Sequence, residues 1–364
     1  MRINILTGPF CCIPPYSIGA VEKLWYLLGQ YWKAQGHEVC FISRLPSAKE
    51  PNDGNKYIKG YDRTGSWLLD FVLDFVYSYK ALRKSSKSDV IVLNSIWSPI
   101  LYRFFKHKFS YALYNVARFP KKQMALYGNM NCLACVSTAV YNAVVLQSPK
   151  MKEKACVIPN PIDTEIFSSQ CRHEYSSEPM IVYTGRVHRE KGLELLVKAV
   201  AVLNKNYHVN LRIIGASEIE KGGSGKDYVE ELNKLACNFN IEWISPIYDP
   251  KELADTIREG NIFCYPSLAE KGETFGVSPL EGMGLGLVPI VSDLDCFKDF
   301  VNEHNGFVFE RKSDSAMKQI ASCIVQLIES RELYEEKSIK AIETAKRFSV
   351  QNVAEMYMKK FKEQ

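Results

Sequence analysis

The chain has 364 residues, of which 46% are hydrophobic and 24% charged, and this composition excludes a disordered or low-complexity protein. No segment has the roughly 18 uninterrupted apolar residues that a spanning helix needs, and MRINILTGPF lacks the features of a secretory signal, so we expect a cytoplasmic protein. The net charge of +5 is unevenly distributed, and the 11 scattered cysteines argue against a disulfide framework.

In the first half, short apolar strands alternate with longer amphipathic stretches. INILTG predicts the first strand, and apolar residues at helical spacing predict a helix from Ile18 to Ala34. Further strands are expected at HEVCFIS, VIVLNS, YALYNV and LACVS. This rhythm predicts a parallel sheet that helices cover on both faces.

A basic, aromatic region begins within the second half of the amphipathic stretch Trp67–Lys84 and continues beyond it. Between residues 75 and 125 only one acid, Asp89, accompanies the cations Lys80, Arg83, Lys84, Lys87, Arg103, Lys106, Lys108, Arg118, Lys121 and Lys122. Aromatic residues lie among these cations, as in YRFFKHKFSY, and such a face can bind an anionic membrane. A solvated face and, for Trp67–Lys84, a core helix remain as alternatives.

The polar, proline-containing stretch from Asn160 to Pro179 indicates a domain boundary. The rhythm then restarts with strands MIVYTG, LRIIG, IEWIS, NIFCYPS and VPIVSD. Helices are expected at Gly192–Leu203 and Asp227–Phe239, and a long last helix from Ala316 is broken near RFSV. We therefore expect two domains, residues 1–165 and 166–340, and a C-terminal helix, residues 341–364, that packs back on the first domain.

Two segments of the second half place charged residues at the ends of predicted strands. In YTGRVHREKGLELL, Arg186 and Lys191 bracket a turn that opens a helix, and such a group suits a diphosphate. In PSLAEKGETFGVSPLEGM, Glu273 stands at a helix entrance and Glu281 about two turns further on. The alternatives are exposed cations beside a turn, a helix-dipole acid and an ordinary helix glutamate.

Together with VIPNPIDTEIF, these segments resemble the retaining glycosyltransferases of the GT4 family. That family has the GT-B fold, an α/β architecture of two Rossmann-like parallel-sheet domains facing across a cleft. The resemblance covers most of residues 157–309 and is weaker before them. The matching positions are Asn160, Pro161, Asp163, Phe167, Gly185, Arg186, Lys191, Gly192, Pro266, Ser267, Glu273, Gly276, Leu280, Glu281, Gly286 and Pro289.

The resemblance implies a hexosyltransferase that moves a hexose from a nucleoside-diphosphate sugar to a glycan acceptor in surface polysaccharide synthesis. It implies catalytic functions for Glu273, Arg186 and Lys191. The remaining donor-binding residues that it implies are Gly19, Thr274, Phe275, Gly276, Val277, Glu281, Ile247 and Tyr248. With the basic region, it leads us to expect a lipid-linked acceptor and peripheral contact with the inner face of the membrane, and no nucleic-acid partner.

The chain departs from the family pattern in two places of the first half. Ala20 follows Gly19 where the family often has a second glycine, and Asn115 stands on the acceptor side where many members have a histidine. We expect no metal or other cofactor, although Asp293 and Asp295 form a DxD pattern. A sugar-nucleotide-binding partner subunit without catalysis, and a GT-B phosphorylase or epimerase, are the alternative functions.

Overall fold

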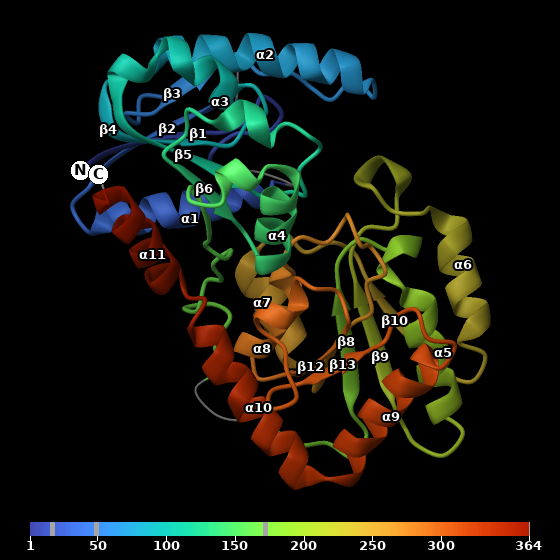
Figure 1. Cartoon of the computed structure of the whole chain (residues 1–364). Helices are drawn as coiled ribbons and strands as arrows, with labels where there is room; N and C mark the ends of the chain where they lie inside the picture. Colours follow the sequence, from blue (N-terminus) through green and yellow to red (C-terminus); the bar gives the residue numbers. More distant parts are fainter. Residues whose placement is uncertain (15–18, 47–50, 170–173, 364) are drawn as a thin grey trace. The chain divides into compact units, whose positions relative to one another are not determined.

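The computed structural model describes residues 1–14, 19–46, 51–169 and 174–363, which form two compact units (Figure 1). The first unit contains Met1–Pro161 and Val350–Gln364, and the second contains Ile162–Ser349. These junctions fall close to the expected ones at residues 165 and 340. No helix within the described residues combines the length and apolarity needed to cross a membrane.

The first unit is built on a parallel sheet of seven strands in the order β3-β2-β1-β4-β5-β6-β7. Its central strands are nearly continuous apolar runs, as expected where helices cover both faces. The strands are β1 (Arg2–Leu6), β2 (Glu38–Arg44), β3 (Lys56–Ile58), β4 (Ser88–Leu93), β5 (Phe109–Val116), β6 (Cys132–Cys135) and β7 (Ala155–Val157).

Two helices from opposite ends of the chain pack together on one face of this sheet, and α2 lies on the other (Figure 1). Trp25 and Trp32 of α1 contact Tyr357 and Phe361 of α11, with ring centroids of Trp25 and Tyr357 5.1 Å apart. The apolar residues of α1 therefore pack in a core to which the C-terminal helix α11 also contributes. The helices are α1 (Ala20–Ala34), α2 (Trp67–Lys84), α3 (Ser98–Leu101), α4 (Thr138–Gln147) and α11 (Val350–Lys362).

The second unit contains a parallel sheet of six strands in the order β10-β9-β8-β11-β12-β13. The strands are β8 (Met180–Thr184), β9 (Asn210–Ile214), β10 (Ile241–Ile244), β11 (Ile262–Tyr265), β12 (Val288–Ser292) and β13 (Phe307–Phe309). The helices are α5 (Leu193–Leu203), α6 (Lys226–Leu235), α7 (Pro250–Arg258), α8 (Val277–Gly284), α9 (Ala316–Glu329) and α10 (Arg331–Lys346).

The predicted elements are present, with three differences. The helix expected to reach Phe239 ends at Leu235, and the long last helix is broken at Ser330 as well as near RFSV. The hydroxyl of Ser330 accepts from the amide of Leu333 and caps α10, which explains this second break. Strands β3 and β13 were not predicted because three residues are too few to show a pattern. The expected helix residue Ile18 lies outside the described residues.

In each sheet, the chain first adds strands toward one edge and then returns to add strands toward the other edge. The two strands on either side of this change are neighbours at the centre of the sheet. In the first unit this point lies between β1 and β4, and in the second between β8 and β11. The loops at the carboxyl ends of two such strands diverge to opposite faces and leave room for a ligand. The fold therefore indicates where each unit should carry its site.

Candidate functional site

Two loops of the second unit meet at the carboxyl ends of β8 and β11. The amide of Leu268, after β11, donates to the carbonyl of Glu190, after β8, over 2.8 Å. Gly192 has a φ of 69°, and a Cβ there would lie 2.1 Å from the carbonyl oxygen of Pro266. Only glycine combines this backbone conformation with so close an approach. Gly192 thus allows the loop after β8 to approach the loop after β11 closely. The two loops, which carry the two predicted segments, form one surface.

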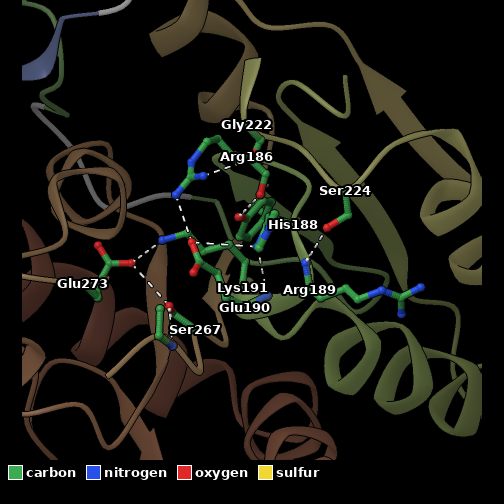
Figure 2. A network of polar contacts seen from close by, with 11 residues as sticks. Arg186, His188, Arg189, Glu190, Lys191, Gly222, Ser224, Ser267 and Glu273 are labelled. Carbon is green, nitrogen blue, oxygen red and sulfur yellow. Dashed lines mark hydrogen bonds and ion pairs between the residues drawn. The ribbon is translucent and has the colours of Figure 1, made fainter. Parts of the chain in front are cut away.

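At the centre of this surface, Lys191 and Glu273 form a buried ion pair (Figure 2). Nζ of Lys191 lies 2.6 Å from Oε2 of Glu273, and Oγ of Ser267 donates to the same oxygen over 3.3 Å. The two charged side chains are only 7% and 11% exposed. Buried charges are tolerated when they are paired and hydrogen-bonded, so each loop supplies the charge that the other requires.

Two stacked tyrosines lie beside the ion pair. Nζ of Lys191 is 5.4 Å from the ring centroid of Tyr265, and that ring stacks on Tyr183 with centroids 5.4 Å apart. Burial, followed by the charge of Glu273, raises the pKa of Tyr265 well above its ordinary value. The phenol therefore stays neutral, and its ring adds a favourable cation–π contact to Lys191.

Arg186 lies at the rim of the same surface and is about half exposed. Its Nη2 lies 2.9 Å from Oε1 of Glu190, and its Nη1 donates to the carbonyl of Gly222 over 3.0 Å (Figure 2). The hydroxyl of Tyr183 donates to the backbone carbonyl of Arg186 over 2.9 Å. These contacts hold the guanidinium in place and leave part of it accessible.

The entrance of α8 follows Glu273 directly. Gly276 precedes the helix with a φ of 103°, and a Cβ there would lie 2.6 Å from the Phe297 ring. Phe275 is buried between Phe300 and Phe348, so its side chain anchors the loop. The first amide groups of α8, from Val277 onward, have no partner within the helix and can bind an anion.

Glu281 lies further along α8 and is buried, with interaction partners of its own. The glycines beside it show that α8 packs closely against its neighbours. A Cβ at Gly282 would lie 2.4 Å from the Phe263 ring, and one at Gly284 would lie 2.4 Å from the carbonyl oxygen of Phe167. A ribose contact for Glu281 stays a prediction, as does a donor contact for the half-buried Thr274.

Two of the other predicted donor residues lie in the second unit, in the loop after a different strand. Ile247 and Tyr248 follow β10, two strands away from β8, and Tyr248 is 58% exposed. Gly19 belongs to the first unit, and its φ of −170° is extended backbone that any residue can adopt. A Cβ at Gly19 would lie 2.9 Å from the carboxyl end of the flexible Glu22 side chain. Base packing and phosphate approach at these positions stay predictions.

Other acids near this surface have cationic partners. Glu270 lies 2.9 Å from Arg311 and 2.5 Å from Lys312, and Arg311 also pairs with Asp293. Asp295 pairs with the exposed Lys298 over 2.7 Å. In the part of the chain that is described, no three His, Cys, Asp or Glu residues gather as metal ligands. The two acids of the DxD pattern thus have salt-bridge partners.

Sequence reasoning missed the two tyrosines and the function of Ser267 as a hydrogen-bond donor to Glu273. Tyr183 and Tyr265 lie in strands that read as ordinary buried runs, so no periodic signal distinguishes them. Their only signal is aromatic character near the carboxyl ends of neighbouring strands. Asn115, in the first unit, is buried in β5 and donates to Oδ1 of Asn94 over 3.0 Å. The sequence offered no indication of this partner.

Comparison with known proteins shows which family the chain resembles. The family model described as glycosyl transferases group 1 matches residues 167–346. The capsular polysaccharide biosynthesis glycosyltransferase CapM of Staphylococcus aureus is 30% identical over 158 residues, which cover 43% of this chain. The match spans only 38% of the length of CapM. An uncharacterised glycosyltransferase of Methanocaldococcus jannaschii is 26% identical over 360 residues, 86% of this chain and 87% of that protein.

Among solved structures, HepE of Anabaena in complex with UDP-glucose is similar over 100% of both chains. The TM-score is 0.74 and the sequence identity 15%, so this likeness shows the fold alone. With the two parallel sheets, it confirms the expected GT-B fold.

Proposed function

The chain belongs to the glycosyl transferases group 1 family through residues 167–346, and we propose that it transfers a hexose from a nucleoside-diphosphate sugar to a hydroxyl of a glycan acceptor. The proposal rests most directly on the Lys191–Glu273 pair. This pair places a cation and a carboxylate at the carboxyl ends of β8 and β11, where the strand order of the second sheet changes direction. The first turn of α8 lies beside it. A donor with an anionic diphosphate and a polyhydroxylated sugar requires both kinds of group.

The proposed donor binding divides the charges between two parts of one molecule. Lys191, Arg186 and the first amides of α8 bind the diphosphate, since a cationic ammonium, a guanidinium and a helix entrance all favour an anion. Glu273 accepts hydrogen bonds from the hexose hydroxyls, and Glu281 those of the ribose. The diphosphate then shares Lys191 with Glu273, because both anions favour the same ammonium.

The proposed reaction retains the anomeric configuration. The bond between the anomeric carbon and the diphosphate oxygen breaks, and the acceptor oxygen attacks the same face of the sugar. The acceptor proton passes to the departing diphosphate. Lys191, Arg186 and the α8 amides stabilise the charge that grows on this leaving group, so a metal is not required by the proposal.

The proposed acceptor is lipid-linked and is reached at an anionic membrane surface. Support comes from α2, on which Trp67 is 73% exposed and Leu68 and Val72 are more than half exposed. The last turns of the same helix carry the exposed cations Lys80, Arg83 and Lys84. An apolar face combined with basic residues is typical of segments that lie on membranes.

A donor panel tests the proposed activity. The protein is incubated with UDP-, GDP- and ADP-hexoses, with and without a chelator, and release of nucleoside diphosphate is measured alongside the anomeric configuration of the product. We expect one donor to be consumed slowly by hydrolysis, with retention, in the presence of the chelator. Nucleotide binding without turnover for any donor or glycan acceptor would favour the partner subunit. Release of free sugar phosphate would favour a phosphorylase, and epimerisation of the donor without an acceptor would favour an epimerase.

A further inference from the structure

Two cysteines of neighbouring strands are in contact at one edge of the first sheet. Sγ of Cys132 in β6 and Sγ of Cys156 in β7 lie 3.4 Å apart, and both are free thiols in this structure. Ala134 pairs with Cys156, so Cys132, two residues earlier on the same face of β6, contacts it diagonally. A disulfide bond is about 2 Å long, so a small movement would bring the two sulfur atoms to bonding distance.

The two thiols differ in their access to solvent. Cys132 is 3% exposed, whereas Cys156 is half-buried, as are the other two residues of β7. β7 is the last strand at its edge of the sheet and is paired on one side only. A three-residue edge strand can shift more easily than a central strand. A small solute therefore reaches Cys156 first, and Cys132 is already in contact with it.

The charges around the pair favour the thiolate form of Cys156. A hydrogen bond from Cys132 and the positive charge of Lys360 in α11 hold the pKa of Cys156 below its ordinary value, against burial and the charge of Glu363. The same hydrogen bond, together with burial, raises the pKa of Cys132. Lys360 is itself partly exposed and pairs with Glu363 over 2.8 Å. Cys156 is therefore the nucleophile of the pair, because the thiolate is the reactive form.

Cys135 is not the partner that its CxxC spacing with Cys132 would indicate. Side chains alternate along a strand, so Cys135 lies on the opposite face of β6. It is completely buried, and its Sγ donates to the carbonyl of Leu133 over 3.8 Å. Burial raises the pKa of this thiol, which keeps it protonated and unreactive. Cys135 therefore provides a matched control for the pair.

We propose that Cys132 and Cys156 form a reversible disulfide in the presence of a hydroperoxide, which makes the edge of the first sheet an oxidant-sensitive modification site. This inference goes beyond the proposed function and does not depend on it. A pair of this kind differs from a permanent disulfide framework, because a dithiol reductant returns both cysteines to thiols.

The proposed oxidation has two steps. Sγ of Cys156 attacks one oxygen of the hydroperoxide, the O–O bond breaks, and Cys156 becomes a sulfenic acid. The departing oxygen takes a proton from solvent and leaves as water or an alcohol. Sγ of Cys132 then attacks Sγ of Cys156, and the proton of Cys132 leaves with the hydroxyl of the sulfenic acid as water. Two thiols are oxidised, and one hydroperoxide is reduced.

The disulfide would fix the segment through which the chain leaves the first unit. β7 is the last strand before the first part of that unit ends at Pro161. Its neighbourhood is held by the amide of Leu133, which donates to the carbonyl of Lys154, and by the amide of Ile158, which donates to the carbonyl of Cys135. A covalent bond between β6 and β7 restricts local opening, so these amides should exchange their hydrogens more slowly in the oxidised protein.

The test treats the folded full-length chain with hydrogen peroxide, blocks the remaining thiols, and identifies linked peptides by mass spectrometry without reduction. We expect a peptide that links Cys132 to Cys156, lighter by two hydrogen atoms, and its loss after treatment with dithiothreitol. Cys156→Ser, at the half-buried position, and Cys132→Ala should not form it. Cys135→Ser should form it as wild type does.

The contribution of Lys360 is tested by the rate of the same reaction. Lys360→Gln removes the positive charge and should slow formation of the linked peptide several-fold, because less Cys156 is ionised. Lys359→Gln, at the neighbouring exposed position of α11, is the control and should react as wild type does. Equal rates for all three proteins would overturn the assignment of Lys360.

Two results would overturn the inference as a whole. The first is a linked peptide that is absent from the folded wild type or forms only after unfolding in urea. The second is oxidation of Cys156 to the sulfinic acid while Cys132 stays a thiol, because the contact would then have failed to resolve the sulfenic acid.

Discussion

Nζ of Lys191 and Oε2 of Glu273 lie 2.6 Å apart in a nearly buried setting, although their positions in the sequence are 82 residues apart. The pair joins the loops after β8 and β11 and holds an ammonium ready beside the entrance of α8. The negative charge of Glu273 offsets part of the positive charge of Lys191. The carboxylate therefore lowers the attraction of the site for a second anion. This relationship leads to the first prediction.

Glu273→Gln should weaken transfer and strengthen binding of the nucleoside diphosphate alone. The substitution removes the negative charge beside Lys191 but keeps a hydrogen-bonding group for Ser267. We expect the diphosphate to bind several-fold more tightly by calorimetry, and turnover of the donor to fall about 100-fold because the hexose is no longer positioned. Weaker diphosphate binding with an intact fold would show that Glu273 serves the structure of the loop only.

Glu270→Gln should change turnover little and serves as the matched control for Glu273→Gln. Glu270 is half exposed, and its partner Arg311 keeps Asp293 after the substitution. Exposed ion pairs of this kind contribute little, because solvent screens the charges. If donor turnover falls as far in Glu270→Gln as in Glu273→Gln, the assignment of the acid within the motif is wrong.

Much of this site could be predicted because its residues lie in short motifs with a physical meaning. Arg186, Lys191 and Glu273 follow strands, and the carboxyl ends of neighbouring parallel strands meet. The pairing of Lys191 with Glu273 could not be predicted, since the sequence does not show that β8 and β11 are neighbours. The contact between Trp25 of α1 and Asn94 could not be predicted either, because it joins residues 69 positions apart through the packing of a helix on the sheet.

Asp74 of α2 should make the stability of the first unit depend on pH. Burial raises the pKa of its carboxyl from the ordinary 3.8 to about 6, against a hydrogen bond from the amide of Trp97. Between these values the folded state binds more protons than the unfolded state, so stability falls as pH rises through this window. Above pH 6 the loss amounts to about 3 kcal/mol at most.

Asp74→Asn keeps an oxygen for the Trp97 amide and removes this loss. We expect denaturant unfolding to show higher stability than wild type at pH 8 and a smaller difference at pH 4. Asp70→Asn on the same helix is the control of opposite sign, because hydrogen bonds from Thr64 lower the pKa of Asp70. Equal pH profiles for Asp74→Asn and wild type would mean that Asp74 is not desolvated as described.

The exposed apolar face of α2 should direct the protein to anionic vesicles. We expect co-flotation with phosphatidylcholine vesicles that contain phosphatidylglycerol, and less binding as salt screens the basic residues. The double variant Leu68→Glu with Val72→Glu should lose this binding. Val202→Glu replaces a similarly exposed apolar residue on α5 and should keep it. Equal flotation of all three proteins would contradict a membrane-facing α2.

The sequence predicted helix α2 but not which of its apolar residues are buried. The spacing of Trp67–Lys84 predicted the helix, and its bounds are confirmed. The same spacing left open whether the apolar residues were core or surface, because periodicity does not say which face meets the sheet. In the structure, Tyr77, Ala81 and Leu82 are buried, and Leu68 and Val72 are exposed.

The central claim is that Lys191 belongs to a donor diphosphate site, and isothermal calorimetry with the preferred nucleoside diphosphate tests it most directly. Lys191→Ala is compared with Arg189→Ala, whose exposed guanidinium pairs with Glu194 and Glu231 away from the site. We predict that Lys191→Ala weakens binding by more than about tenfold, as expected for loss of a charge-assisted hydrogen bond, and that Arg189→Ala binds as wild type does. Equal affinities for wild type and a folded Lys191→Ala protein would contradict the claim.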